Sequence, residues 1–322
     1  MDKYSQLQFN SRYNEIYHIL VKNRSVSEKA SAYVMGGQPG AGKSSLASFI
    51  ERKYLNNNAV NISGDDYRKL HPNFNKLYEI HGDNYIDYTR KFSSQVVEKL
   101  IDDCSNKRYS LLIEGTMRSC EVPLETCKLL KSRNYEVSLF VMATQPVISY
   151  VGTLTRYEKM LDIGTVARKT TKEQHDDIVS KIASNLEKIY KSNEFDNIVI
   201  MNRNQEVIYD MSQTPHINPG YILKQYHIKP LTEKEIEKCK SDLEYVIKSM
   251  INRGEDKNVI EDVKKFYTNF LKDNREKNIL NKKSYTKEEL KDFVNQVKSK
   301  KENNKLLDVK KNSINKNKMK DR

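Results

Sequence analysis

The sequence predicts an α/β fold in which a mostly parallel sheet has helices on both faces and is followed by a helical C-terminal extension. Three observations support this prediction. Short apolar strands alternate with amphipathic helices up to about residue 210. A glycine-rich turn joins the first strand to the helix that follows it. Near residue 229 the composition shifts, and the chain becomes rich in Lys and Glu with helical spacing of its apolar residues.

The elements of the first half follow from the spacing of apolar residues. A helix is expected where apolar residues recur every three or four positions, and a buried strand where a short apolar run ends at a turn. The elements expected in chain order are a helix or two within residues 1–30 (with FNSRYNEIYHILVKN), a strand AYVMGG (32–37), a helix SSLASFIERKYL (44–55), a strand AVNIS (59–63) and a helix YIDYTRKFSSQVVEKLIDDC (85–104).

The second half repeats this alternation until the sheet is complete. The elements expected in chain order are a strand YSLLIEG (109–115), a strand VSLFVMA (137–143), a helix KEQHDDIVSKIASNLEKIYKS (172–192) and a pair NIVIMN (197–202) with EVIYD (206–210). The last pair is close enough in sequence to form a hairpin or an edge pair.

The composition excludes several classes of protein. Hydrophobic residues make up 37% of the 322 residues, and 20 Tyr and 9 Phe can build a core in a polar chain. No apolar run reaches the ~18–20 residues of a transmembrane helix, and the N-terminus lacks the apolar stretch of a signal peptide. We therefore expect a cytoplasmic protein without membrane contact. The four cysteines contain no C-x-x-C pair, so we expect free thiols rather than disulfides or a zinc ribbon.

Charge and composition divide the chain into three parts. We expect an α/β domain at residues 1–229, a helical extension at 230–297 and a basic tail at 298–322. The tail has ten Lys or Arg against three acidic residues, so it contributes +7 of the net charge of +13. Its low content of core-forming residues predicts a disordered or loosely helical segment. Because the remaining chain is only mildly basic, nucleic-acid binding by the fold itself is not expected.

A phosphate-binding loop follows the first strand. Residues 37–44 read Gly-Gln-Pro-Gly-Ala-Gly-Lys-Ser and match the P-loop pattern G-x-x-x-x-G-K-[ST] in full. Glycines let backbone N–H groups converge on phosphate oxygens, and the next helix directs its positive end towards them. We expect Lys43 to reach the β- and γ-phosphates of ATP and the Ser44 hydroxyl to bind Mg²⁺, as in P-loop kinases. The residues expected to bind the nucleotide are Gly37, Gln38, Pro39, Gly40, Ala41, Gly42, Lys43, Ser44 and Ser45.

Carboxylates stand where the second and third strands end. Asp65 and Asp66 follow AVNIS, and Glu114 lies at the end of YSLLIEG. Because the carboxyl ends of parallel strands meet at one edge of the sheet, these side chains are expected near the phosphate loop. Asp65 could accept a proton from an acceptor hydroxyl, hold Mg²⁺ or simply cap the next helix. Glu114 could bind Mg²⁺ through water, contact the acceptor or lie in solvent.

Two arginines follow in a segment that could close over the nucleotide. Arg156 and Arg168 flank residues 157–167 (YEKMLDIGTVA), which we expect to be a loop between two helices. Kinases of this type use lid arginines to stabilise charge on the transferred phosphoryl group. The alternative is that both are ordinary surface arginines of a basic protein.

Taken together, these segments resemble the zeta toxin family of bacterial toxin–antitoxin systems. The segments that resemble the family are, in chain order, GGQPGAGKSSL, Asp65 with YRKLHPNF, LLIEGTMRS with VPLET, YVGTLTRYEKM and ARKTTKEQHD. The resemblance implies a kinase that uses ATP and Mg²⁺ to phosphorylate the 3′-hydroxyl of the amino sugar of UDP-N-acetylglucosamine, a reaction that blocks peptidoglycan synthesis. It also implies a small helical antitoxin that blocks the ATP site.

The resemblance assigns roles to individual residues of this chain. It implies catalytic roles for four side chains, which are Asp65 as the base, Lys43, Arg156 and Arg168. It implies binding of the sugar nucleotide by four others, which are Glu114, Thr116, Arg118 and Thr126. The helical part from residue 230 onward falls outside the resemblance.

Two alternatives remain open at the level of sequence. The acceptor could be another UDP-sugar, a nucleoside or an antibiotic, since the P-loop specifies only the nucleotide. The protein could also be a nucleic-acid-associated ATPase or polynucleotide kinase that uses its basic tail, in which case binding would depend steeply on salt concentration.

Overall fold

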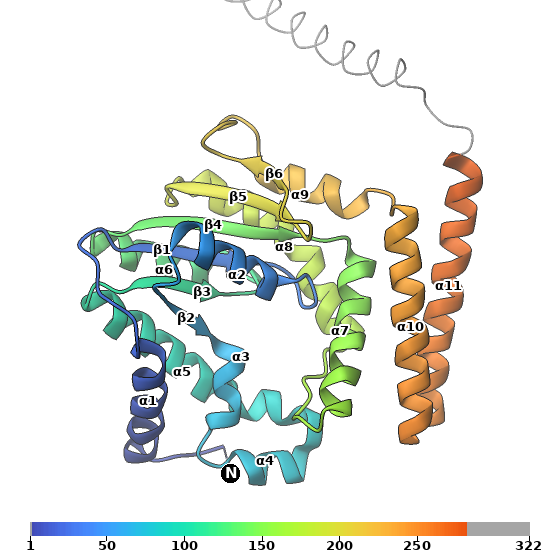
Figure 1. Cartoon of the computed structure of the whole chain (residues 1–322), viewed down its shortest axis with the longest axis horizontal. Helices are drawn as coiled ribbons and strands as arrows, with labels where there is room; N and C mark the ends of the chain where they lie inside the picture. Colours follow the sequence, from blue (N-terminus) through green and yellow to red (C-terminus); the bar gives the residue numbers. More distant parts are fainter. Residues whose placement is uncertain (1, 282–322) are drawn as a thin grey trace, which may run out of the picture. The chain divides into compact units, whose positions relative to one another are not determined.

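The computed structural model describes residues 2–281, with their side chains as far as residue 274. Within this range six strands form one sheet, in the order β2-β3-β1-β4-β5-β6 (Figure 1). The strands are β1 (Ser31–Gly36), β2 (Ala59–Ser63), β3 (Ser110–Glu114), β4 (Glu136–Ala143), β5 (Asn197–Asn202) and β6 (Val207–Asp210). The first five are parallel to their neighbours, and β6 pairs antiparallel with β5. The predicted parallel sheet and its edge pair are therefore confirmed.

Helices connect the strands, and further helices come after the last strand in the chain. The longer helices are α1 (Gln6–Val21), α2 (Lys43–Tyr54), α5 (Tyr85–Asn106), α6 (Glu121–Ser132), α7 (Pro146–Asp162), α8 (Lys172–Ser192), α9 (Pro219–Ile228), α10 (Glu233–Arg253) and α11 (Lys257–Asn281). Short turns of helix lie between β2 and α5, namely α3 (Gly64–Tyr67), η1 (Arg68–Leu70), α4 (Phe74–His81) and η2 (Gly82–Asn84). The helices predicted at 44–55, 85–104 and 172–192 are confirmed as α2, α5 and α8.

The sheet has a hydrophobic core on each face, as predicted. Alternate side chains of a strand point to opposite faces, so Val34 and Met35 of β1 belong to different cores. On one face α1, α5, α6, α8 and α9 bury apolar side chains, including Phe92 and Leu186. On the other face α2 packs against the central strands through Leu46 and Ile50. The P-loop helix therefore lies alone on its face of the sheet within the described chain.

The first helix of the predicted extension packs against the kinase-like part of the chain. Contacts divide the protein into two units, Met1–Val263 and Lys264–Arg322, so α10 belongs to the same unit as the sheet. Leu243, Val246 and Met250 are buried on α10, which packs along α7. The helical character predicted for the extension is confirmed by α10 and α11. The boundary at residue 229 remains a prediction, and the basic tail at 298–322 lies outside the described residues.

Four cysteines lie in the core of the described chain as buried free thiols, at positions 104, 120, 127 and 239. Between residues 2 and 281 no helix combines the length and the apolar character that a bilayer crossing requires.

Candidate active site

The P-loop has the strand–loop–helix context that the motif requires. It leaves β1 at Gly36 and enters α2 at Lys43. Gly40 has φ +72° and Gly42 has φ +103°, conformations that residues with a Cβ rarely adopt. A Cβ on Gly40 would lie 2.0 Å from the carbonyl oxygen of Ser149, which lies in the first turn of α7. Glycine is thus required at position 40 both for its backbone angle and for close packing against α7.

Side chains from neighbouring strand ends hold the loop in place. The buried Gln38 amide donates to the carbonyl of Thr144 at 2.7 Å, and the Thr144 hydroxyl donates to the carbonyl of Ala41 at 2.8 Å. Arg203, just after β5, donates from Nε to Ala41 O at 3.1 Å and also bonds to Gly40 O. These bonds satisfy loop carbonyls from within the protein, so the loop is preorganised before any ligand binds.

Lys43 lies buried at the centre of the candidate site. Its Nζ donates to the carbonyl of Gly37 at 2.9 Å and lies 3.6 Å from Oε1 of Glu114. Burial lowers the pKa of Lys43, and the nearby Arg156 lowers it further, whereas Glu114 and Asp65 raise it. The side chain is therefore surrounded by charges of both signs.

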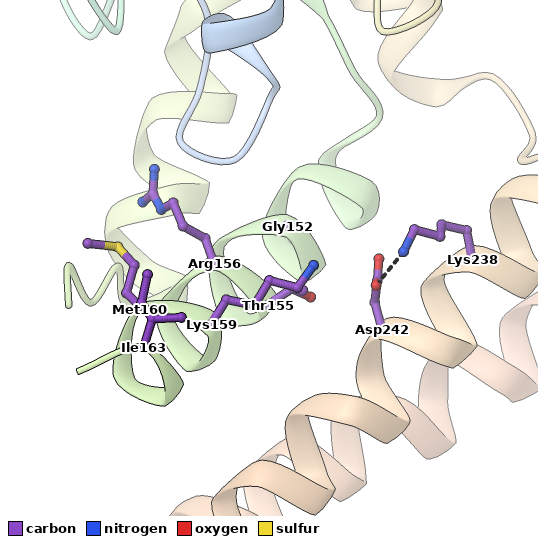
Figure 2. A pocket seen from close by; sticks show the side chains of 8 residues that line it. All are labelled: Gly152, Thr155, Arg156, Lys159, Met160, Ile163, Lys238 and Asp242. Carbon is purple, nitrogen blue, oxygen red and sulfur yellow. Dashed lines mark hydrogen bonds and ion pairs between the residues drawn. The ribbon is translucent and has the colours of Figure 1, made fainter. Parts of the chain in front are cut away.

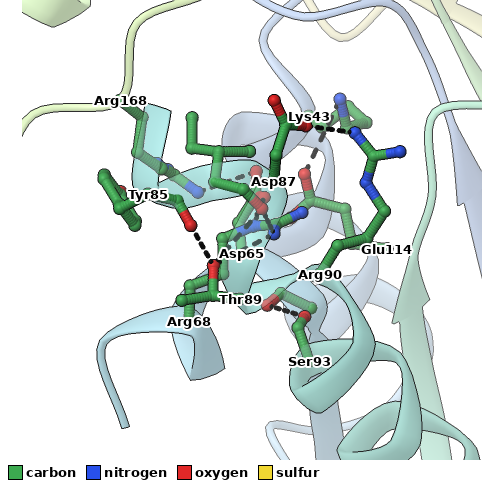
Figure 3. Close-up of polar contacts among 12 residues, drawn as sticks. Lys43, Asp65, Arg68, Tyr85, Asp87, Thr89, Arg90, Ser93, Glu114 and Arg168 are labelled. Atoms are coloured by element: carbon green, nitrogen blue, oxygen red, sulfur yellow. Dashed lines mark hydrogen bonds and ion pairs between the residues drawn. The ribbon is translucent and has the colours of Figure 1, made fainter. Parts of the chain in front are cut away.

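Asp65 is held by two arginines. It lies in α3, directly after β2, and its two carboxylate oxygens contact different partners: Arg168 Nη1 at 2.8 Å and Arg68 Nε at 3.0 Å (Figure 3). Burial alone would raise the pKa of this carboxyl, but Arg168, Arg68 and Lys43 outweigh burial and hold the pKa below its ordinary value. The side chain remains 47% exposed, so a ligand can reach it while it is ionised.

Glu114 and Asp65 meet at the same edge of the sheet. Ser63 of β2 is the register partner of Glu114 of β3, and Met35 of β1 is its partner on the other side. Glu114 therefore stands between the strand that leads to Asp65 and the strand that leads to the P-loop. The prediction that these strand ends converge is confirmed, and Figure 3 shows Glu114, Lys43 and Asp65 in one group.

The two predicted lid arginines come from different kinds of structure. The expectation that residues 157–167 form a loop is wrong for its first part, because α7 continues to Asp162 and Arg156 lies within it. Only the segment between α7 and α8, which contains Arg168, is non-helical. The Nε atoms of Arg156 and Arg168 are buried and have no hydrogen-bond partner in the described structure. Burial lowers the pKa of Arg156, and Arg168 adds to this effect.

Three of the four residues predicted to bind the sugar nucleotide make no hydrogen bond or ion pair with Lys43, Asp65 or Arg168 among the described residues. Arg118 is exposed and pairs with Asp177 of α8 at 3.0 Å. Thr116 is exposed after β3, and Thr126 is half-buried in α6. Among the described residues, neither threonine makes a hydrogen bond to Lys43, Asp65 or Arg168. Only Glu114 is in direct contact with the P-loop lysine.

The oxygen donors near the loop suit magnesium. Ser44 lies exposed in the first turn of α2, next to Lys43, and Glu114 is close to the same lysine. The described residues contain no cluster of three or more His, Cys, Asp or Glu side chains that could form a metal cage. Mg²⁺ in kinases is held by one or two protein oxygens together with substrate phosphates and water, so this sparse donor set fits it.

Two arginines were missed by the sequence reasoning although the sequence contains signals for both. Arg68 follows Asp65 by three residues, which is the spacing of neighbours on a helix, and it also donates to the carbonyl of Ile86 at 2.8 Å. Arg203 follows β5, so the rule that parallel strand ends meet at one edge places it near the P-loop.

Sequence similarity to known proteins covers most of this chain. The sequence model of the zeta toxin family matches residues 18–214. The chain is 35% identical to toxin zeta from Streptococcus agalactiae over 235 residues, which are 73% of this chain and 82% of the relative. It is 37% identical to toxin PezT from Streptococcus pneumoniae over 211 residues, which are 65% of this chain and 83% of the relative.

A solved structure shows the same fold. It comes from work on the PezAT chromosomal toxin–antitoxin system of Streptococcus pneumoniae, and it superposes with a TM-score of 0.67 at 30% sequence identity. The match covers 77% of this chain and 97% of that one. The P-loop, the strand order around it and the extent of these matches lead to one conclusion, that the chain belongs to the zeta toxin family.

Proposed function

We propose that the protein is a toxin kinase that transfers the γ-phosphoryl group of ATP to the 3′-hydroxyl of UDP-N-acetylglucosamine. The observation on which this proposal rests is the arrangement of Asp65 opposite the P-loop lysine. An exposed, ionised carboxylate and a buried lysine lie at the same edge of the sheet, together with two arginines. Transfer to a hydroxyl needs a base for the hydroxyl proton and cations around the phosphoryl group, and these residues supply both.

Asp65 is the residue proposed to activate the acceptor. A sugar hydroxyl is a weak nucleophile at neutral pH, and a carboxylate within hydrogen-bond reach can remove its proton as the new O–P bond forms. The contacts to Arg168 and Arg68 orient this carboxylate and keep it ionised. The proton passes to Asp65, and the leaving oxygen remains on the nucleotide, so no covalent enzyme intermediate is involved.

The cations of the site are proposed to bind and stabilise the phosphates. Lys43 and the N–H groups of the P-loop would hold the β- and γ-phosphates, while Arg156 and Arg168 would face the transferred group. Mg²⁺ would neutralise phosphate charge, with the Ser44 hydroxyl as its protein ligand. The buried Nε atoms of Arg156 and Arg168, which have no partner among the described residues, are free to bond to phosphate oxygens.

The acceptor is inferred from the family. The resemblance of the segments around Glu114 and Arg118 to zeta toxins supports UDP-N-acetylglucosamine, and Glu114 lies where an acceptor next to Lys43 would be contacted. Thr116, Arg118 and Thr126 remain predicted contacts of the sugar nucleotide. Phosphorylation of this precursor would block peptidoglycan synthesis and would take place in the cytoplasm.

An antitoxin is proposed as the partner. The relative with a solved structure comes from a toxin–antitoxin system, so a small helical protein that blocks the ATP site would restrain this chain as well. Co-expression with the neighbouring gene product would test this, with restored growth and a stable complex as the expected results.

An acceptor panel tests the proposed reaction. ATP turnover would be measured separately with each of four acceptors under the same conditions. These are UDP-N-acetylglucosamine, UDP-glucose, UDP-N-acetylgalactosamine and uridine. The proposal expects turnover that depends on UDP-N-acetylglucosamine, with a phosphorylated product of the corresponding mass. Turnover with uridine alone would assign a nucleoside kinase, and turnover stimulated by DNA or RNA would assign the nucleic-acid alternative.

A further inference from the structure

A buried ion pair joins α10 to the helix that contains Arg156. Glu158 of α7 is only 2% exposed, and Arg253 at the end of α10 bonds to both of its carboxylate oxygens, at 3.1 Å for the Nη2–Oε1 contact. Arg253 also contacts Glu255 at 2.8 Å. A buried carboxylate needs such a partner, because an unpaired charge in the protein interior is costly. The pair therefore fixes one side of α7 to α10.

Arg156 lies on a different side of the same helix. Glu158 follows it by two positions, a rotation of about 200° around an α-helix, so the two side chains point in nearly opposite directions. Figure 2 shows the Arg156 side chain extending from α7 away from Lys238 and Asp242 of α10. The pair between Glu158 and Arg253 thus helps to fix the rotation of α7, and with it the direction in which Arg156 extends.

The guanidinium of Arg156 has little support of its own. Its Nε is buried, and no hydrogen bond or ion pair to Arg156 is present among the described residues. Its neighbour Arg168 is different, because it is held by Asp65 at 2.8 Å. The direction of Arg156 therefore depends on the position and rotation of α7. A cavity of about 370 Å³ lies beside Arg156 and Lys159 of α7 and is also lined by Lys238 and Asp242 of α10.

We propose that Arg253 is a positioning residue for phosphoryl transfer, which acts through Glu158 and α7 to direct Arg156 into the site. This inference rests on the phosphotransferase role proposed above for Arg156. It gives α10 a function, although α10 lies beyond residues 18–214, the part matched by the family model. The extension is then a part of the enzyme rather than an appendage.

A double-mutant cycle between Arg253 and Arg156 tests the proposal. Arg253→Met should lower kcat about tenfold or more, with a smaller change in the KM for ATP, because misplacing a charge-stabilising group affects the transition state most. In an Arg156→Ala background the same substitution should cause less than about a twofold further loss. Lys240→Met is the matched control, since among the described residues Lys240 pairs only with the exposed Glu237 on α10 itself; its kcat should equal that of the wild type.

If Arg253→Met lowered kcat by the same factor in the wild type and in the Arg156→Ala variant, the proposal would be overturned, because Arg253 would then act without Arg156. If Arg253→Met does not fold, the cycle is run with Arg253→Lys. This substitution keeps the positive charge but loses the bidentate contact with Glu158. Hydrogen exchange supplies a readout without turnover. The amides of α7 around Arg156 should exchange faster in the Arg253 variant than in the control, and unchanged exchange would also overturn the proposal.

Failure of the proposed reaction can be told apart from failure of this inference. If the wild type shows no acceptor-dependent turnover, the proposed function fails, and the same cycle is measured on the affinity for ATP by calorimetry. Non-additive losses of affinity together with faster exchange in α7 would support positioning by Arg253, and additive losses would contradict it.

Discussion

Arg168 Nη1 lies 2.8 Å from the Asp65 carboxylate, which links the segment between α7 and α8 to the end of β2. The candidate base and a candidate phosphate ligand are thus in contact with each other. Arg168 affects the charge state of Asp65, because against the effect of burial it is the largest single cause that lowers the pKa of Asp65. This contact makes the pH dependence of the reaction a test of the site.

Arg168→Gln should move the acidic limb of the kcat/KM profile to higher pH. Loss of the guanidinium leaves the effect of burial, which raises the pKa of Asp65, less opposed. A base with a higher pKa is protonated at higher pH, so activity is lost earlier as the pH falls. The shift should be about one pH unit, as expected for removal of an adjacent cation. Arg90→Gln, which removes an exposed arginine paired with Asp87, should leave the limb in place. If the acidic limb of the kcat/KM profile lay at the same pH in the wild type, Arg168→Gln and Arg90→Gln, Asp65 would be excluded as the titrating base.

Gly40→Ala should destabilise the protein and abolish nucleotide binding. The added Cβ would meet the Ser149 carbonyl at 2.0 Å in addition to the strain of φ +72°. Gly254→Ala provides the control, because Gly254 has φ +74° and nothing within 4 Å of the added Cβ. The control should cost about 1–2 kcal/mol of unfolding free energy, and Gly40→Ala about 1–3 kcal/mol more. Denaturant unfolding measures both, and equal losses would show that close packing against α7 is not important.

The sequence was sufficient for the class of the fold, the P-loop and the strand ends. Motif spacing and the parallel-sheet rule placed Lys43, Asp65 and Glu114 at one edge because these are local or topological properties. The helical course of residues 157–162 was not predicted, since their contacts with α10 come from residues about 90 positions away, as in the bond from Arg253 to Glu158. Arg203 was missed for the same reason, because its bonds to the P-loop span 162 positions or more. Long-range packing cannot be inferred from local periodicity.

Lys43→Ala should relieve toxicity in cells. The lysine is buried at the P-loop, and its loss removes the only proposed side-chain contact from α2 to the β- and γ-phosphates. Induced expression of the wild type should stop growth or cause lysis, whereas the variant should grow normally at the same protein level. Lys53→Ala, on the exposed side of α2, is the control and should remain toxic. Growth with the wild type would contradict a toxin role.

The stability of the fold should fall as the pH drops from neutral towards about 4. Burial lowers the pKa of His227 to about 4, and His175 adds to this effect. Because the unfolded chain then binds more protons than the folded one, unfolding is favoured once the pH falls below the ordinary histidine range. His227→Gln should reduce the difference in unfolding free energy between pH 7.5 and pH 5, whereas substitution of the exposed His216 should not. An equal pH dependence in all variants would assign the effect to other groups.

The central claim is that Asp65 removes the acceptor proton while the P-loop holds the nucleotide. The most direct measurement is ATP turnover with UDP-N-acetylglucosamine in the wild type, in Asp65→Asn and in Asp66→Asn, combined with the ATP affinity of each. Asp65→Asn should lower kcat by about 10²–10⁴-fold and retain ATP binding, and Asp66→Asn should turn over like the wild type. Similar losses in both variants, or full activity of Asp65→Asn, would contradict the account.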